Sequence, residues 1–137
     1  VLIAGGHIAV LQNRLELFGL SDALPGRPVF AWSAGAMALT DRVVLFHDHP
    51  PQGAGDAEVL SRGLGLVPNV VVLPHARHRL RLDDPVRVSL LASRFSPSRC
   101  VPFDEGDRLS WDGQTLSASP TSRWLQADGA MHQGVSP

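Results

Sequence analysis

Residues 29–39 read VFAWSAGAMAL, a short β-like run that passes through a serine into a helix-like run. A strand that turns abruptly into a helix at a serine is a nucleophile elbow, in which the turn lifts the hydroxyl clear of the sheet. Small neighbours are needed because the turn is crowded and its central residue is strained. Gly35 fills the second glycine position of the G-x-S-x-G motif, whereas Ala31 replaces the first. The alternative is that Ser33 only caps a buried helix.

A strand and a helix are expected before this elbow. Val1–Ala4 is all apolar, which is typical of a parallel strand buried on both faces, and Gly5-Gly6 permits a tight turn after it. The helix pattern that follows has apolar residues at steps of three and four, namely Ile8, Leu11, Leu15 and Phe18. With a strand at Val29–Ala31, these segments predict a βαβ unit and a parallel sheet.

Two further strands are expected to end near the same site. Val70–Leu73 is the strongest apolar run of the chain, and His75 stands just past its carboxyl end. Arg99–Phe103 is a further short strand, which ends at an acidic segment. Ligands of open α/β sheets bind outside the carboxyl ends of strands, so we expect Ser33 and His75 to lie together there.

The remaining patterns complete the predicted fold. Ala57–Arg62 is expected to form a helical turn or two, and a helix with Asp84 as N-cap and Pro85 as first residue runs to Phe95. Tight turns around Asp112-Gly113 and Asp128-Gly129 predict two hairpins. The predicted fold class is α/β: three layers, α/β/α, with a mostly parallel, flavodoxin-like sheet, helices on both faces, and β-hairpins at the C-terminal end.

Composition limits the class of protein. The chain has 137 residues, which predicts one domain over 1–137. A net charge of −1 does not indicate a nucleic-acid or anionic-membrane partner, and no apolar run is as long as a membrane span. Cys100 is the single cysteine and is expected to be a small buried residue, which fits a reducing, cytoplasmic location.

A serine nucleophile needs a base within hydrogen-bond reach and an acid that orients the base. His75 is the preferred base because it follows the strongest strand, and Asp104 and Glu105 follow the next strand. The order serine, histidine, acid differs from that of α/β-hydrolases. The histidines from which the base could come are His7, His47, His49, His75, His78 and His132.

The oxyanion of an acyl-transfer reaction needs two backbone donors. The N–H of Ala34, directly after the serine, is the natural first donor, and the Gly5-Gly6 turn would supply the second. Loss of one such donor typically slows catalysis by about 10²–10³-fold.

Together these residues resemble peptidase family S51, which contains aspartyl dipeptidase (dipeptidase E) and cyanophycinase. The resemblance covers roughly residues 1 to 110 and lacks the family's N-terminal βα units. It rests on the Gly5-Gly6 turn, the Trp-Ser-Ala-Gly-Ala elbow, Asp48, the segment Gly-Leu-Gly-Leu-Val-Pro at 63–68, and His75 with Arg79 and Arg81 beyond it.

The resemblance implies a class I glutamine amidotransferase-like fold and serine hydrolysis of an amide bond in small peptides, with Asp-containing dipeptides as candidate substrates. Ser33 would be the nucleophile and His75 the base. Glu105 is the favoured acid and Asp104 the alternative. Asp48 would shape the site. No metal or organic cofactor is required.

Other interpretations of these residues stay open. Arg79 could bind a substrate carboxylate, or its guanidinium group could form salt bridges with Asp83 and Asp84. The chain could be a catalytically inactive binding module of the same superfamily, and a homo-oligomer would cover an open sheet edge. A metal-dependent hydrolase is a further alternative, with ligands from the set His47, His49, His75 and His78 around Asp48.

Overall fold

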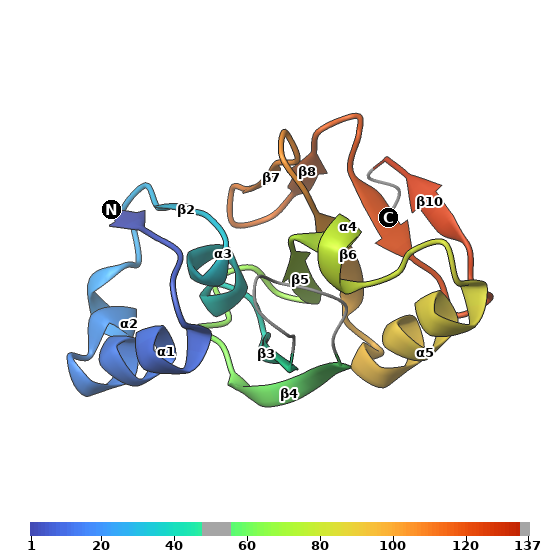
Figure 1. Cartoon of the computed structure of the whole chain (residues 1–137). Helices are drawn as coiled ribbons and strands as arrows, with labels where there is room; N and C mark the ends of the chain where they lie inside the picture. Colours follow the sequence, from blue (N-terminus) through green and yellow to red (C-terminus); the bar gives the residue numbers. More distant parts are fainter. Residues whose placement is uncertain (48–55, 135–137) are drawn as a thin grey trace.

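The computed structural model describes residues 1–47 and 56–134. In this part of the chain the strands form five two-stranded ladders, two parallel and three antiparallel (Figure 1). Each ladder joins strands that the chain brings together locally or across one crossover.

The N-terminal βαβ unit forms as predicted, but its first strand is not buried on both faces, since Leu2 is exposed and only Ile3 is buried. β1 (Leu2–Ile3) pairs in parallel with β2 (Phe30–Ala31), and α1 (Ile8–Leu17) crosses between them. A short helix, α2 (Leu20–Ala23), follows α1. Ile8 and Leu15 are buried in the main core and Leu11 packs against it, as the apolar spacing predicted, whereas Phe18 is exposed at the C-cap of α1.

An antiparallel pair follows the elbow helix. α3 (Ala34–Ala38) leads into β3 (Arg42–His47), which pairs with β4 (Asp56–Arg62). The prediction of helical turns over Ala57–Arg62 is therefore wrong. Propensity favours a helix there only weakly, and the neighbouring apolar strand β3 offers a complete set of backbone partners, so pairing decides the conformation.

The second parallel pair lies at the centre of the molecule. β5 (Val70–Pro74) is buried along its whole length and pairs in parallel with β6 (Arg99–Phe103). Between them the chain forms α4 (Ala76–Arg79) and α5 (Pro85–Phe95). Both strands and the longer helix were predicted with these bounds or close to them.

The expected N-cap of α5 is also present. The Oδ1 of Asp84 accepts hydrogen bonds from the backbone N–H groups of Val86 and Arg87, at 3.0 and 3.2 Å. Pro85 occupies the first turn, where a missing N–H costs nothing. Local chemistry alone is sufficient to start this helix.

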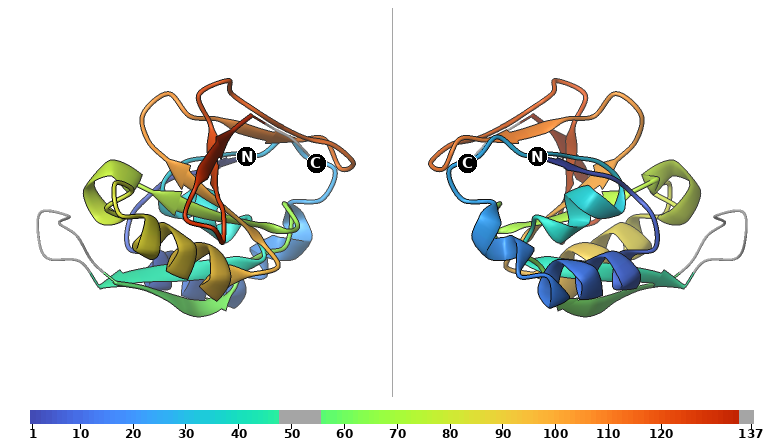
Figure 2. Two further views of the ribbon diagram at one scale, coloured as in Figure 1. Left: turned by 90° about the vertical axis from the view of Figure 1, so that its right-hand side faces the viewer. Right: turned by 90° about the vertical axis from the view of Figure 1, so that its left-hand side faces the viewer.

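Two hairpins end the chain, as the turn signals predicted. β7 (Leu109–Trp111) pairs with β8 (Leu116–Ala118), and β9 (Arg123–Leu125) pairs with β10 (Met131–Gln133). Figure 2 shows these hairpins on one side of the β5–β6 pair, with α1 and α5 on the other. Trp124 of β9 is buried against the apolar side chains of β5 and β6.

The predicted three-layer α/β/α domain with a mostly parallel, flavodoxin-like sheet is wrong. Within the described residues the strands form separate two-stranded ladders, mostly antiparallel, and no ladder joins β2 to β5. β1 and β2 contribute only two residues each, and β3, which follows the elbow helix, pairs antiparallel with β4. Apolar periodicity identifies a buried strand but specifies neither its partner nor its direction, and this is where the prediction failed.

The core of the described residues joins both halves of the chain. Side chains from α1, α3, β3, β5 and α5 form one apolar cluster. In this part of the chain, no helix has the length and apolar character needed to cross a lipid bilayer. The elbow helix α3 and the strand β5 pack into the same apolar cluster.

Candidate active site

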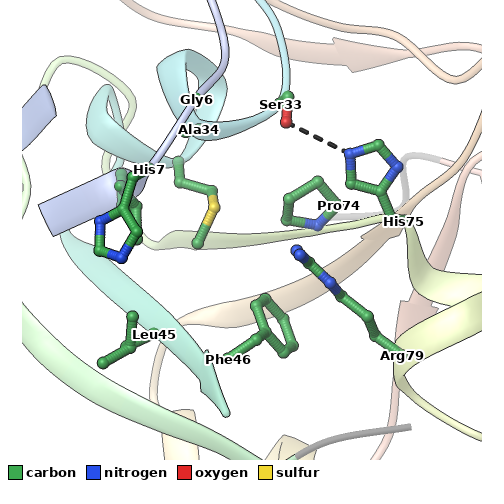
Figure 3. A pocket seen from close by; sticks show the side chains of 11 residues that line it. Gly6, His7, Ser33, Ala34, Leu45, Phe46, Pro74, His75 and Arg79 are labelled. Carbon is green, nitrogen blue, oxygen red and sulfur yellow. Dashed lines mark hydrogen bonds between the residues drawn. The ribbon is translucent and has the colours of Figure 1, made fainter. Parts of the chain in front are cut away.

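Ser33 adopts the strained conformation of a nucleophile elbow. Its φ and ψ are 53° and −124°, which few non-glycine residues adopt. Ser33 stands at the N-cap position of α3, yet its side chain makes no capping hydrogen bond. Its Oγ lies 3.3 Å from Nε2 of His75 instead (Figure 3).

Two glycines allow the elbow to pack closely. A Cβ atom on Gly35 would lie 2.2 Å from the carbonyl oxygen of Ile3, so α3 could not approach β1 with any larger residue there. A Cβ atom on Gly5 would lie 2.9 Å from Cβ of Ser33 and 3.1 Å from its Oγ. Gly35 therefore sets the distance between α3 and β1, and Gly5 leaves room for the hydroxyl of Ser33.

His75 reaches the serine because β5 ends in a left-handed residue. His75 has φ 57° and ψ 41° and forms the N-cap of α4. Its carbonyl accepts hydrogen bonds from the N–H groups of His78 and Arg79, both at 3.1 Å. The change of direction at this residue turns the imidazole toward Ser33.

The two candidate acids differ in position. Pro74 and Phe103 are partners in the β5–β6 register, so His75 and Asp104 leave adjacent strand ends. The Oδ1 of Asp104 accepts the backbone N–H of Arg77, two residues after His75, at 3.1 Å. Glu105, the acid favoured from the sequence, is exposed to solvent.

One oxygen of Asp104 has no hydrogen bond. Its Oδ2 is buried, and the nearest cation is Nε of Arg77 at 3.6 Å. Within residues 1–47 and 56–134, no hydrogen bond joins the His75 ring to a carboxylate. Asp104 therefore follows the strand end next to that of His75, and its Oδ2 is paired with Arg77 but has no hydrogen bond, whereas the serine–histidine contact is already made.

The expected oxyanion donors line the same site. Gly6 and Ala34 border the cavity next to Ser33, and Gly5 packs against the serine side chain. In the described part of the chain, the backbone N–H groups of Gly6 and Ala34 donate to no other residue. Both groups are thus available to an oxygen of a bound molecule.

A cavity of about 480 Å³ opens in front of Ser33 and His75. That volume lies within the range of small-molecule sites. Figure 3 shows Arg79 extending into it beside Phe46 and Pro74. The guanidinium of Arg79 lies 4.8 Å from the centre of the Phe46 ring, a cation–π contact that fixes its position.

Several residues of this cavity were not expected from the sequence. Met37 of α3 and Leu45 and Phe46 of β3 form its apolar wall; His7, one of the histidines considered as the base, also lines it. The apolar run of β3 is visible in the sequence, but its place beside Ser33 follows from the antiparallel pair β3–β4. No sequence signal distinguishes these residues from ordinary core.

The other expected site residues lie elsewhere. The Nε2 of His47 contacts Oε2 of Glu58 at 3.2 Å on the surface, and His78 and His132 are exposed. Asp48 and His49 lie outside the described residues. Among the residues that are described, no three histidine, cysteine, aspartate or glutamate side chains are grouped to hold a metal ion.

No protein-family model matches this chain, and no curated protein matches its sequence.

Proposed function

We propose that this chain is a serine hydrolase that cleaves an amide bond in a small peptide. The observation that carries the proposal is the contact between Oγ of Ser33, held in a strained elbow, and Nε2 of His75 at 3.3 Å. A serine hydroxyl becomes a nucleophile when a neighbouring base takes its proton, and this distance is close to the reach that such a transfer requires. Strain at one serine beside one histidine is a pattern of functional sites rather than of plain core packing.

In the proposed reaction, Oγ of Ser33 attacks the substrate carbonyl while Nε2 of His75 takes the hydroxyl proton. The N–H groups of Ala34 and Gly6 then donate to the oxyanion. His75 returns the proton to the leaving amine, and water releases the acyl group by the same route. The chain's own groups supply every proton transfer in this scheme.

We assign the acid to Asp104 rather than to Glu105. Asp104 leaves the strand next to the one that ends at His75, and its buried Oδ2 has no hydrogen bond. A carboxylate in this place stabilises the imidazolium that forms during the reaction and fixes the orientation of the ring. Glu105 is exposed and makes no hydrogen bond or ion pair within the described residues.

The cavity favours a substrate with a carboxylate and a modest apolar part. Arg79 provides a guanidinium beside the reacting serine, and Met37, Phe46 and Pro74 provide apolar contacts. Arginine binds carboxylates through paired hydrogen bonds. Aspartyl dipeptides fit this description, and the resemblance of the motifs to the dipeptidase family supports the same substrate class.

A fluorophosphonate probe tests the proposal because it reacts covalently with activated serines. The folded chain should be labelled at Ser33, and labelling should disappear in Ser33→Ala. Ser98→Ala is the matched control, since Ser98 is a buried serine directly before β6 that does not line the cavity and should not change labelling. Absence of labelling in a folded chain would support the inactive binding module instead.

A panel of dipeptides then tests the substrate class. Asp-X dipeptides and β-aspartyl-arginine should be hydrolysed, and Asn-X counterparts, in which only the side-chain carboxylate of the first residue is replaced by a neutral amide, should be poorer substrates. Equal turnover of both sets would contradict the assigned carboxylate preference. The serine mechanism would still stand.

A further inference from the structure

The turn that carries Asp104 is closed by two hydrogen bonds to a single residue. The N–H of Asp107 donates to the carbonyl of Asp104 at 3.2 Å, and the N–H of Asp104 donates to Oδ2 of Asp107 at 3.0 Å. Gly106 has φ 90°, which the third residue of a type II turn requires. Asp107 therefore holds the backbone of Asp104 at both its donor and its acceptor.

The second carboxylate oxygen of Asp107 is fixed from the C-terminal part of the chain. Its Oδ1 accepts the hydroxyl of Thr121 at 3.0 Å. The same hydroxyl lies 3.2 Å from Oγ of Ser119, which in turn contacts Oγ of Ser122 at 2.8 Å. Ser122 is fully buried, so this series of hydrogen bonds ends on a rigid support.

Asp104 is the end of this series that lies next to His75 along the β5–β6 strand ends. Its side chain is 12% exposed, with Oδ1 on the first turn of α4 and Oδ2 buried without a hydrogen bond. A carboxylate that orients a histidine acts only within a narrow range of positions, and a displacement of about 1 Å can cost about 10²-fold in rate. The two hydrogen bonds to Asp107 set the position of the Asp104 backbone.

We propose that Asp107 is a positioning residue: its carboxylate, held by Thr121, fixes the backbone of Asp104 so that the Asp104 side chain stays beside His75. This inference rests on the proposed function and deepens it. It gives the C-terminal segment between β8 and β9 a role in catalysis, although that segment contributes no residue to the cavity. Asp107 does not touch the substrate.

The test measures fluorophosphonate labelling of the full chain at a series of probe concentrations. Asp107→Ala should lower the maximal labelling rate at Ser33 about tenfold or more and leave the half-saturating probe concentration unchanged. Asp107→Asn, which keeps one carbonyl oxygen, should fall between Asp107→Ala and the natural chain. Thr121→Val removes only the hydroxyl that holds Asp107 and should show a smaller loss in the same direction, which keeps the test valid if Asp107→Ala does not fold.

Asp112→Ala is the matched control. The Oδ1 of Asp112 accepts backbone N–H groups of Gln114 and Thr115, at 2.8 and 2.7 Å, in the β7–β8 turn. The Asp112→Ala change removes the same kind of hydrogen bond from a turn that does not carry Asp104. The maximal labelling rate should therefore stay at that of the natural chain.

A double-mutant cycle separates positioning from general stability. In an Asp104→Asn background, Asp107→Ala should cause no further loss of labelling rate, while its effect on the unfolding midpoint should persist. Losses that multiply, or an Asp107→Ala chain that labels at the natural rate, would overturn the inference and leave the proposed function standing. A natural chain that is folded and unlabelled at Ser33 would overturn both.

Discussion

The Oγ of Ser33 lies 3.3 Å from Nε2 of His75, although 42 positions separate the two residues in the chain. Ser33 is placed by the turn from β2 into α3, and His75 by the turn from β5 into α4. Both residues have positive φ, so both turns direct a side chain away from the strand that precedes it. The contact therefore depends on two independent backbone turns that meet at one cavity.

Replacement of Ser33 should separate activity from stability. Ser33→Ala and Ser33→Gly should both abolish fluorophosphonate labelling. Ser33→Gly should be about 1 kcal/mol more stable than Ser33→Ala because glycine adopts a positive φ without strain. Urea unfolding of the two variants measures this difference, and a less stable glycine variant would show that the elbow stores no strain.

Three glycine-to-alanine changes should have distinct effects. A Cβ atom would meet a backbone oxygen at 2.2 Å in Gly35→Ala and at 2.0 Å in Gly63→Ala, so each should lose about 1–3 kcal/mol of stability. Gly5→Ala meets the Ser33 side chain instead and should mainly slow labelling. Gly63 contacts the C-terminal end of α3 and does not line the cavity, so the Gly63→Ala chain should label normally once corrected for its folded fraction.

Arg79 should determine the preference for a negatively charged substrate. Arg79→Ala should raise KM for a carboxylate-bearing peptide about tenfold or more, since a hydrogen bond to a charged group contributes about 1.5–3 kcal/mol. Arg79→Lys should restore only part of this binding because a single ammonium cannot form paired hydrogen bonds. Arg81→Ala is the control, because Arg81 is exposed and does not line the cavity. An unchanged KM in Arg79→Ala would contradict the assignment.

Cys100 should be unreactive in the folded chain. Burial raises the pKa of its thiol to about 12, an effect that Arg42 offsets only in part. A thiol reagent at mildly alkaline pH should modify Cys100 only after unfolding in guanidinium. Because the folded pKa is raised from 9.0 to about 12, this thiol's contribution to stability is complete below the lower value and is lost as pH rises through the upper one. Rapid modification of the native chain would contradict the burial of Cys100.

The β7–β8 turn should lose support in acid. Hydrogen bonds from the backbone N–H of Thr115, and then of Gln114, lower the pKa of the Asp112 carboxyl. A lowered folded pKa means that the stabilisation is present above the ordinary value of about 3.9 and is lost as pH falls through the folded one. The unfolding midpoint of Asp112→Asn should accordingly change less than that of the natural chain over this acidic range. Parallel curves for the two chains would contradict the prediction.

Features that depend on neighbouring residues were predictable from the sequence. The spacing of Ile8 and Leu15 predicted α1, and Asp84-Pro85 predicted the start of α5. The turns at Asp112-Gly113 and Asp128-Gly129 predicted both hairpins. Each of these signals acts within one helical turn or one tight turn, so no distant contact is needed to read it.

The sequence also predicted that Ser33 and His75 would lie together, although the sheet on which that prediction rested is not the one observed. The expectation needed only that both residues follow strands and that the strand ends share an edge. The ladders are instead separate, and α3, β3 and β5 bring the two turns together through a common apolar core. Asp104 and Glu105 are adjacent and both carry a carboxyl group, so the sequence alone could not decide which of them is the better candidate acid.

The sequence by itself determined the turn into a helix at Ser33, the strand before His75, the helices α1 and α5, and the terminal hairpins, because each is fixed by side-chain volume, capping or turn chemistry within a few residues. Only the tertiary structure decided that β3 pairs antiparallel with β4, that Phe46 and Arg79 wall the cavity, and that the Asp104 side chain is mostly buried while Glu105 is exposed. These outcomes depend on which backbone groups find partners across long separations. That choice is made by the packing of the whole chain, and local sequence does not record it.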